Sequence, residues 1–341
     1  MAKRVLVTGA DGFVGRALCR QVEEERFLLR AAVWQPPPIE SAGWQAHRTS
    51  YPSDTVVVGD IGSVTDWSEA LQGVDVVIHL AARVHVMKEN AADPLAEFRR
   101  GNVEGTERLA RSSAEAKVKR FVYVSSIGVN GNSTQEFPFT EKDDPHPHDP
   151  YSLSKWEAEQ VLKLISRETG LELVIVRPPL AYGPRVPGNF LRLLRLVSSG
   201  IPLPLGSIEN KRSFIGVRNL ASFLVRCVQH PKAVGETFLV ADGEDLSTPD
   251  LIRRIAKALG VPDRLFPFPP GILHWAARVL GRWEEFQRLC GSLQVDASKA
   301  RSLLDWKPPF PVNEGLAEMA DWYRDAARRG KQGLHPMGGD P

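Results

Sequence analysis

The stretch at residues 4–15 reads RVLVTGADGFVG, and it decides the fold of the chain. Residues 5–8 have the pattern of a short buried strand, and a helical pattern begins at Arg16. Glycines between a strand and a helix allow a tight turn, close approach of the backbone to a pyrophosphate, and close packing of the helix on the sheet. The spacing is G-x-x-G-x-x-G rather than G-x-G-x-x-G, and a turn with only a packing role is the alternative. Its position directly after the first strand favours a dinucleotide site, with these candidate contacts: Gly9, Asp11, Gly12, Phe13, Val14 and Gly15.

A second strand is expected at residues 28–34, after which such folds often present a carboxylate to the adenosine ribose. No Asp or Glu lies between Phe27 and Ile39, and the strand ends at Trp34, which becomes the candidate contact. A missing carboxylate leaves a 2′-phosphate unopposed, although Arg30 is the only local cation that could attract one. We therefore expect NAD or NADP, with a slight preference for NADP.

Two further strands, at residues 56–61 and 74–80, are expected to end beside the cofactor. Asp60 and Ile61 stand where a strand end would meet an adenine, although a capping role for Asp60 is an equal alternative. Asn102 either holds neighbouring strands or an active-site water, or is an ordinary polar residue of a helix running to about Ala116. Small residues after the fourth strand would let the backbone pass close to a ribose and pyrophosphate: Leu80, Ala81 and Ala82.

Two pairs of polar residues carry the chemistry. Ser125 and Ser126 follow a buried strand at 121–124, on the carboxyl edge where ligands of parallel sheets bind. Tyr151 and Lys155 share one face of an expected helix, and a fixed cation favours the phenolate form of tyrosine. Ordinary strand-end serines and a chance Tyr-x-x-x-Lys are the alternatives, and the upstream glycine turn argues against both. We expect Ser126 to bind a substrate oxygen, Tyr151 to pass its proton, and Lys155 to hold the nicotinamide ribose and lower the pKa of Tyr151.

Together these motifs resemble the extended short-chain dehydrogenase/reductases over nearly the whole chain. The resemblance implies an α/β fold: a Rossmann-type doubly wound parallel sheet at residues 1–180, completed by a strand at about 235–242. A smaller, discontinuous substrate-binding region is expected mainly at 181–327, and a loose tail at 328–341. The matching motifs, in chain order, are Gly9-Gly12-Gly15, Asp60-Ile61, His79 to Ala82, Ser125-Ser126, Tyr151 with Lys155, and Arg177-Pro178. Pro178, Tyr151 and Lys155 join the expected cofactor contacts.

Within that superfamily the chain looks like the UDP-glucose 4-epimerase-like branch, which implies a UDP-sugar substrate. Relatives that dehydrate or decarboxylate sugars carry acidic residues just after the catalytic serine, whereas residues 127 and 128 are Ile and Gly. The family Asn that helps bind the sugar diphosphate is replaced by Leu180, and Asn189 is a candidate substitute. The resemblance further implies substrate contacts from Ser125, Ser126 and Arg212, with Arg288 a weaker candidate.

The composition of the chain indicates which partners, metal sites and cellular compartment to expect. The 341 residues carry a formal charge of +2, too mild to favour nucleic acid or a membrane surface as the main partner. Three cysteines without metal-ligand spacing predict no metal site and a reducing compartment, and with no apparent signal peptide or membrane span we expect a cytoplasmic protein. The resemblance also allows a homodimer.

The expected reaction is hydride transfer at sugar C4. The missing ribose carboxylate favours a reductase of a UDP-4-keto-6-deoxy-N-acetylhexosamine in surface-polysaccharide precursor synthesis. The alternative is a UDP-glucose or UDP-N-acetylglucosamine 4-epimerase with tightly bound NAD. A redox-inactive NAD(P)-binding regulatory protein is the alternative from another class, against which the intact Ser-Tyr-Lys set argues.

Overall fold

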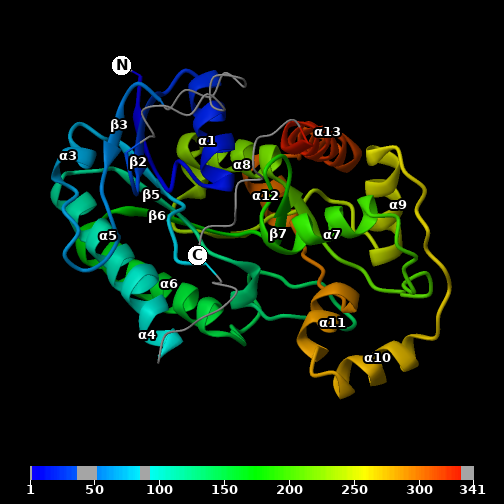
Figure 1. The fold of residues 1–341 in the computed structure, drawn as a ribbon. Helices are drawn as coiled ribbons and strands as arrows, with labels where there is room; N and C mark the ends of the chain where they lie inside the picture. The colour runs from blue at the N-terminus through cyan, green and yellow to red at the C-terminus, as the bar shows by residue number, and fades with distance from the viewer. Residues whose placement is uncertain (1, 37–51, 85–92, 332–341) are drawn as a thin grey trace.

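A seven-stranded parallel sheet lies at the centre of the chain in a computed structural model, which describes residues 2–36, 52–84 and 93–331 (Figure 1). The strand order is β3-β2-β1-β4-β5-β6-β9, and every neighbouring pair is parallel. The order reverses between β1 and β4, which opens a crevice at the carboxyl ends of these strands. The predicted doubly wound fold is confirmed. The strands are β1 (Arg4–Thr8), β2 (Leu28–Val33), β3 (Thr55–Val57), β4 (Val76–His79), β5 (Arg120–Val124), β6 (Glu172–Arg177) and β9 (Thr237–Leu239).

Helices cover both faces of the sheet because alternate strand residues point to opposite sides. In β1, Val5 and Val7 join one buried core and Leu6 joins another, and all three side chains are fully buried. The first core packs under α1 (Phe13–Glu24), α8 (Val217–Gln229) and α12 (Ser298–Leu304). The second packs under α3 (Ser68–Leu71), α5 (Gly105–Glu115) and α6 (Pro150–Thr169).

A separate buried core supports the C-terminal region. It is built around α7 (Gly188–Ser198), α9 (Thr248–Leu259), α13 (Val312–Lys331) and the two-stranded sheet of β7 (Leu180–Tyr182) and β8 (Phe214–Gly216). These distinct cores divide the described residues into a sheet region and a C-terminal region. Helices α8 and α12 belong with the sheet region, although they come after residue 181. Residues 328–331, expected to begin a loose tail, are the end of α13, and residues 332–341 lie outside the described residues.

Short helical turns connect several of these elements. A π-helical turn, η1 (Arg100–Glu104), joins α4 (Pro94–Arg99) to α5, and a short 3-10 helix, η2 (Ile127–Val129), follows β5. Another 3-10 helix, η3 (Pro231–Ala233), precedes β9. Residues 37–51, between β2 and β3, lie outside the described residues.

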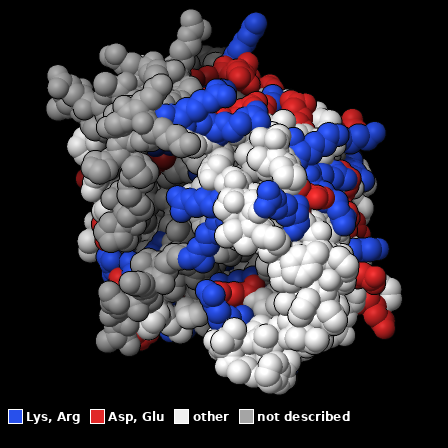
Figure 2. Space-filling model, turned by 45° about the vertical axis from the view of Figure 1, so that its right-hand side comes forward, with Lys and Arg blue, Asp and Glu red and all other residues white. Residues whose placement is uncertain are grey.

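Two helices carry apolar side chains on the surface. Helices α10 (Pro270–Val279) and α11 (Trp283–Cys290) form the lowest part of the molecule in Figure 1, and neither has a buried residue. Trp275 in α10 is 65% exposed. The lower part of Figure 2 correspondingly shows few charged side chains. Across the described ranges, no helix combines the length and apolar character needed to cross a bilayer.

Gly15→Ala is expected to lower the free energy of unfolding by about 1–3 kcal/mol. The new methyl would lie 2.0 Å from the Gly9 carbonyl oxygen, so the turn or α1 must move. Denaturant unfolding followed by circular dichroism measures the change. Gly271→Ala is the matched control, because its Cβ would meet nothing within 4 Å and helical alanine is favoured over glycine. Equal stability of the two variants would contradict the close packing described here.

Candidate active site

The glycine turn and the end of β4 lie side by side at the carboxyl edge of the sheet. A Cβ on Gly9, whose φ is +65°, would lie 3.0 Å from the backbone N and Cα of Ala81. Thr8 Oγ1 accepts a hydrogen bond of 3.3 Å from the Ala81 N–H. The structure thus brings together the predicted contacts at 9–15 and 80–82, which are far apart in the sequence.

The first turn of α1 is suited to a pyrophosphate. Gly12 is the N-cap residue of this helix of 12 residues and has no side chain to satisfy the first N–H groups, while Phe13 and Val14 begin the helix. The Asp11 carbonyl accepts from Arg16 Nε at 2.7 Å, which closes the turn on the other side. Free N–H groups at a helix N-terminus favour anions. The backbone packs too closely for side chains at residues 9 and 15, and the helix begins directly beside this turn. This arrangement fits the pyrophosphate of a dinucleotide.

Asp60 and Ile61 lie in the loop after β3, and both contact neighbouring elements. The Asp60 carboxylate accepts from Arg100 at 2.8 Å, while its backbone carbonyl accepts from Thr65 Oγ1. Ile61 packs against the start of α5, since a Cβ on Gly105 would lie 2.5 Å from Ile61 Cγ2. Asp60 therefore does not cap a helix; it forms an exposed ion pair.

Asn102 is buried at the π-helical turn and joins three segments. Its side-chain oxygen accepts from the Arg83 N–H at 2.7 Å, and its Nδ2 donates to the Arg83 carbonyl and to Ser154 Oγ, both at 3.0 Å. Of the two alternatives read from the sequence, the structure favours the one in which Asn102 holds neighbouring elements. It connects the chain after β4 to the first turn of α6.

The side chain that could attract the 2′-phosphate of NADP has other partners. Arg30, the cation expected to attract a 2′-phosphate, instead binds the Asp54 carboxylate at 2.9 Å and the carbonyls of residues 69, 70 and 72. Its side chain is only 12% exposed. Trp34 follows β2 and is 60% exposed. Arg30 is thus a structural residue of the β2–β3 edge.

Ser126 meets the first turn of α6 through Gly128. The Ser126 hydroxyl oxygen accepts from the Gly128 N–H at 3.1 Å and caps η2. A Cβ on Gly128 would lie 3.3 Å from Ser126 Oγ and 2.3 Å from Ser152 Oγ. A side chain at residue 128 would require the Ser152 side chain to move, and Ile127 is buried in a small core.

Tyr151 and Lys155 lie in the first turns of α6, which begins with Asp149 as its N-cap. The Tyr151 ring contacts Phe98 edge-on, with centroids 6.1 Å apart. Lys155 is 2% exposed, and its Nζ lies 4.2 Å from the centroid of the Tyr123 ring. Pro178, at the end of β6, accepts from the Ile127 N–H and so fixes the loop that carries Ser126.

The pKa of Tyr151 shifts upward in this structure, opposite to the expected direction. Burial raises the pKa of Tyr151 to about 12, and the Asp149 carboxylate adds to this effect. Burial also lowers the pKa of Lys155 to about 7, while the charge of Glu159 opposes that fall. Desolvation disfavours both charged forms, and it is the largest cause of each shift.

A buried network of hydrogen bonds and an ion pair, which was not predicted from the sequence, lies next to these residues. Glu159 is fully buried and binds Arg177 through both oxygens, at 2.9 and 2.6 Å. Ser125 donates to the same carboxylate at 2.6 Å, and Arg177 also donates to Asn130 at 2.9 Å. Ser125 thus faces this network, which corrects its expected role as a substrate contact. The signal in the sequence was the spacing of four between Lys155 and Glu159.

The expected substrate contacts are spread over the C-terminal region. Asn189 is exposed in the first turn of α7. Arg212 is half-buried and donates to the Gly291 carbonyl at 2.8 Å. Arg288 is exposed on α11 and pairs with Glu284 at 3.2 Å, which is typical of a solvated helix face. Arg212 is therefore better placed than Arg288 for a buried anion.

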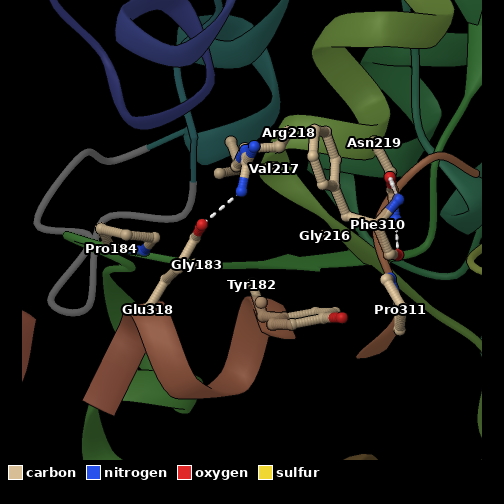
Figure 3. Close-up of a pocket in the computed structure, with 11 residues that line it drawn as sticks. Tyr182, Gly183, Pro184, Gly216, Val217, Arg218, Asn219, Phe310, Pro311 and Glu318 are labelled. Carbon is tan, nitrogen blue, oxygen red and sulfur yellow. Dashed lines mark hydrogen bonds and ion pairs between the residues drawn. The ribbon is translucent and has the colours of Figure 1, made fainter. Parts of the chain in front are cut away.

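A small pocket lies between β7, the start of α8 and α13 (Figure 3). Arg218 lies over the Phe310 ring, 3.4 Å from its centroid, and reaches Glu318 across the pocket, while Asn219 binds the Phe310 backbone. These polar groups bind one another, and Ser126, Tyr151 and Lys155 do not line the pocket. We therefore assign it to packing between the two regions.

Comparisons with known proteins agree with this geometry. Residues 5–241 match the model of the NAD dependent epimerase/dehydratase family. A UDP-glucose 4-epimerase from Vibrio cholerae is 40% identical over 333 residues, which cover 96% of this chain and 98% of that protein. An N-acetyl-alpha-D-glucosaminyl-diphospho-ditrans,octacis-undecaprenol 4-epimerase from Escherichia coli O157:H7 is 28% identical, over 93% and 94% of the two chains.

A solved structure shares the fold. The UDP-glucuronic acid 4-epimerase from Bacillus cereus, in complex with NAD, superimposes with a TM-score of 0.74 over 94% of this chain and 99% of that chain, at 22% identity. The family match, the full-length relative and the shared fold point the same way. The chain therefore belongs to the NAD dependent epimerase/dehydratase family and is an enzyme of that class.

Proposed function

We propose that this enzyme is an NAD-dependent nucleotide-sugar 4-epimerase whose substrate is UDP-glucose or UDP-N-acetylglucosamine. The observation that carries the proposal is the 40% identity to a UDP-glucose 4-epimerase over nearly the full length of both chains. Epimerisation at C4 thus replaces the 4-ketoreductase as the leading reading. The lack of an acidic residue at positions 127 and 128 argues against a dehydratase, which needs an added acid and base.

The proposed catalytic residues act on one oxygen atom, the C4 hydroxyl or carbonyl oxygen of the sugar. Bound NAD supplies the hydride acceptor and donor for sugar C4. Tyr151 takes the proton from the C4 hydroxyl and returns it, and Ser126 hydrogen-bonds the same oxygen. Lys155 holds the nicotinamide ribose, and in its protonated form it favours the Tyr151 phenolate. Because burial leaves the pKa of Lys155 at about 7, its charge is sensitive to its surroundings near neutral pH.

The remaining contacts follow from placement in the fold. We propose the turn at 9–15 and residues 80–82 for the cofactor phosphates and ribose, with Trp34, Asp60 and Ile61 around the adenosine. Arg212 suits the sugar diphosphate through the N–H groups that Gly291 does not use. Asn189 and Arg288 are secondary candidates, because both are exposed.

A 4-ketoreductase remains the second candidate. It is favoured by the absence of an acidic residue at the end of β2, which first suggested an exchangeable NADP. The two reactions use the same residues and differ in the fate of the cofactor. In the epimerase the hydride leaves and returns while the cofactor stays bound, whereas in the reductase it is delivered once.

Incubation of the enzyme with UDP-glucose or UDP-N-acetylglucosamine is expected to give the C4 epimer without net use of cofactor. Products are separated by anion-exchange chromatography while absorbance at the reduced-nicotinamide band is followed. A parallel incubation supplies a UDP-4-keto-6-deoxy-N-acetylhexosamine with NADH or NADPH. Stoichiometric loss of reduced cofactor with the keto sugar alone would make the enzyme a reductase.

Tyr151→Phe is expected to reduce kcat by roughly 10²–10⁴-fold, because the variant loses the group that moves the proton. Initial rates with the active sugar measure this effect. Tyr323→Phe is the matched control, since its hydroxyl contacts Ser198 in the C-terminal core and should leave turnover unchanged. Full activity of Tyr151→Phe would contradict the proposed role of Tyr151 and would favour the alternative of a redox-inactive NAD(P)-binding regulatory protein.

NAD is expected to be the nucleotide that the enzyme retains, because Arg30 is engaged by Asp54 and backbone carbonyls. Acid denaturation of the purified protein and mass spectrometry of the released nucleotide identify it. Arg30→Gln should leave the ratio of NAD to NADP affinity unchanged, although it should destabilise the fold. Recovery of NADP, or a ratio that changes in Arg30→Gln, would contradict this assignment.

A further inference from the structure

Glu159 connects the elements that carry the proposed catalytic groups. Its carboxylate lies on α6, one helical turn after Lys155, and is fully buried. It accepts from Ser125 at the end of β5 and from Arg177 at the end of β6. Arg177 continues the connection to Asn130, which follows the loop of Ser126. Three segments of backbone are thus held by one carboxylate.

The same carboxylate is also the charge that Lys155 faces along its own helix. Side chains four residues apart lie on one helical face, and burial strengthens the interaction between their charges. The other titratable groups around Lys155 come from three elements and are uncharged near neutral pH. They are His79 on β4, whose pKa is lowered to about 3 by burial, Tyr123 on β5, whose pKa burial raises, and Tyr151 on α6.

We propose that Glu159 is a positioning residue of the active site, which sets both the placement of the Ser126 loop and the charge of Lys155. This inference rests on the proposed function for its catalytic consequence. A purely structural Glu159 would affect how much active enzyme forms, but it would not move the pH at which activity is lost. That distinction makes the role testable.

Glu159→Gln keeps the shape of the side chain and removes its charge, so it should make Lys155 lose its proton at lower pH. The alkaline limb of kcat, measured from pH 6 to 9, is expected to move down by about one pH unit. With the limb moving from about pH 7 to about pH 6, the loss of kcat at pH 8 is about fivefold larger than the loss at pH 6. Glu159→Asp keeps the charge, so its limb should stay at the wild-type pH even if kcat falls. A uniform loss of kcat with an unmoved limb in Glu159→Gln would overturn the proposal.

Glu157→Gln is the matched control on the same helix. Glu157 pairs with exposed Arg99, away from the buried network, so its loss should leave the pH profile unchanged. Because Glu159→Gln leaves Arg177 buried without its partner, a second variant combines Glu159→Gln with Arg177→Met. Removing both charges of a buried pair is tolerated far better than removing one. The double variant is expected to fold and to show the same downward movement of the alkaline limb.

A measurement without turnover separates this proposal from the proposed function. Lysine labelled with carbon-13 at Cε reports the titration of Lys155 by NMR, with its resonance assigned through Lys155→Met. The pKa of Lys155 should be lower in Glu159→Gln than in wild type and unchanged in Glu157→Gln. An unaltered titration would refute the role of Glu159 whatever the activity. Inactivity of the wild type on every UDP-sugar, with the expected NMR change, would refute only the proposed function.

Discussion

The backbone around Gly9 is packed so closely that it dictates much of the surrounding architecture. The turn must pass within van der Waals contact of Ala81 on one side and of α1 at Gly15 on the other. This contact is possible only with β4 directly beside β1, while β2 and β3 continue on the other side. The resulting reversal of strand order opens the sheet edge where the cofactor and substrate groups meet.

Burial decides the electrostatics of the site more than the pairing of charges does. The same hydrophobic environment raises the pKa of Tyr151 and lowers that of Lys155. A helix that places a lysine in a dry core needs a compensating negative charge, and α6 supplies it one turn later. The Glu159–Arg177 pair then balances that carboxylate in turn, because an unpaired buried charge would be strongly destabilising.

Several errors of the sequence reading share one cause. Ser125 was expected to contact substrate, Arg30 to attract a phosphate, and Lys155 to depress the pKa of Tyr151. Each of these side chains has the right chemistry, but its partners come from residues distant in the chain, such as Glu159 and Asp54. Hydrogen-bond partners and desolvation depend on the packed structure, so no local pattern could reveal them. The exposed apolar face of α10 is a similar case, since its periodicity indicates a helix but not which side faces the protein.

The sequence by itself determined the fold class, the family and the order of the motifs along the chain. Short buried strands, a glycine turn before a helix, and a Tyr and Lys four residues apart are local patterns with few structural solutions. Only the tertiary structure decided which polar groups form hydrogen bonds inside the protein, and hence which of them remain to bind ligands. It brought Glu159, Ser125 and Arg177 together from separate elements. The physical reason is that burial and long-range contacts are properties of the packed chain, whereas turns and periodicities are properties of its local sequence.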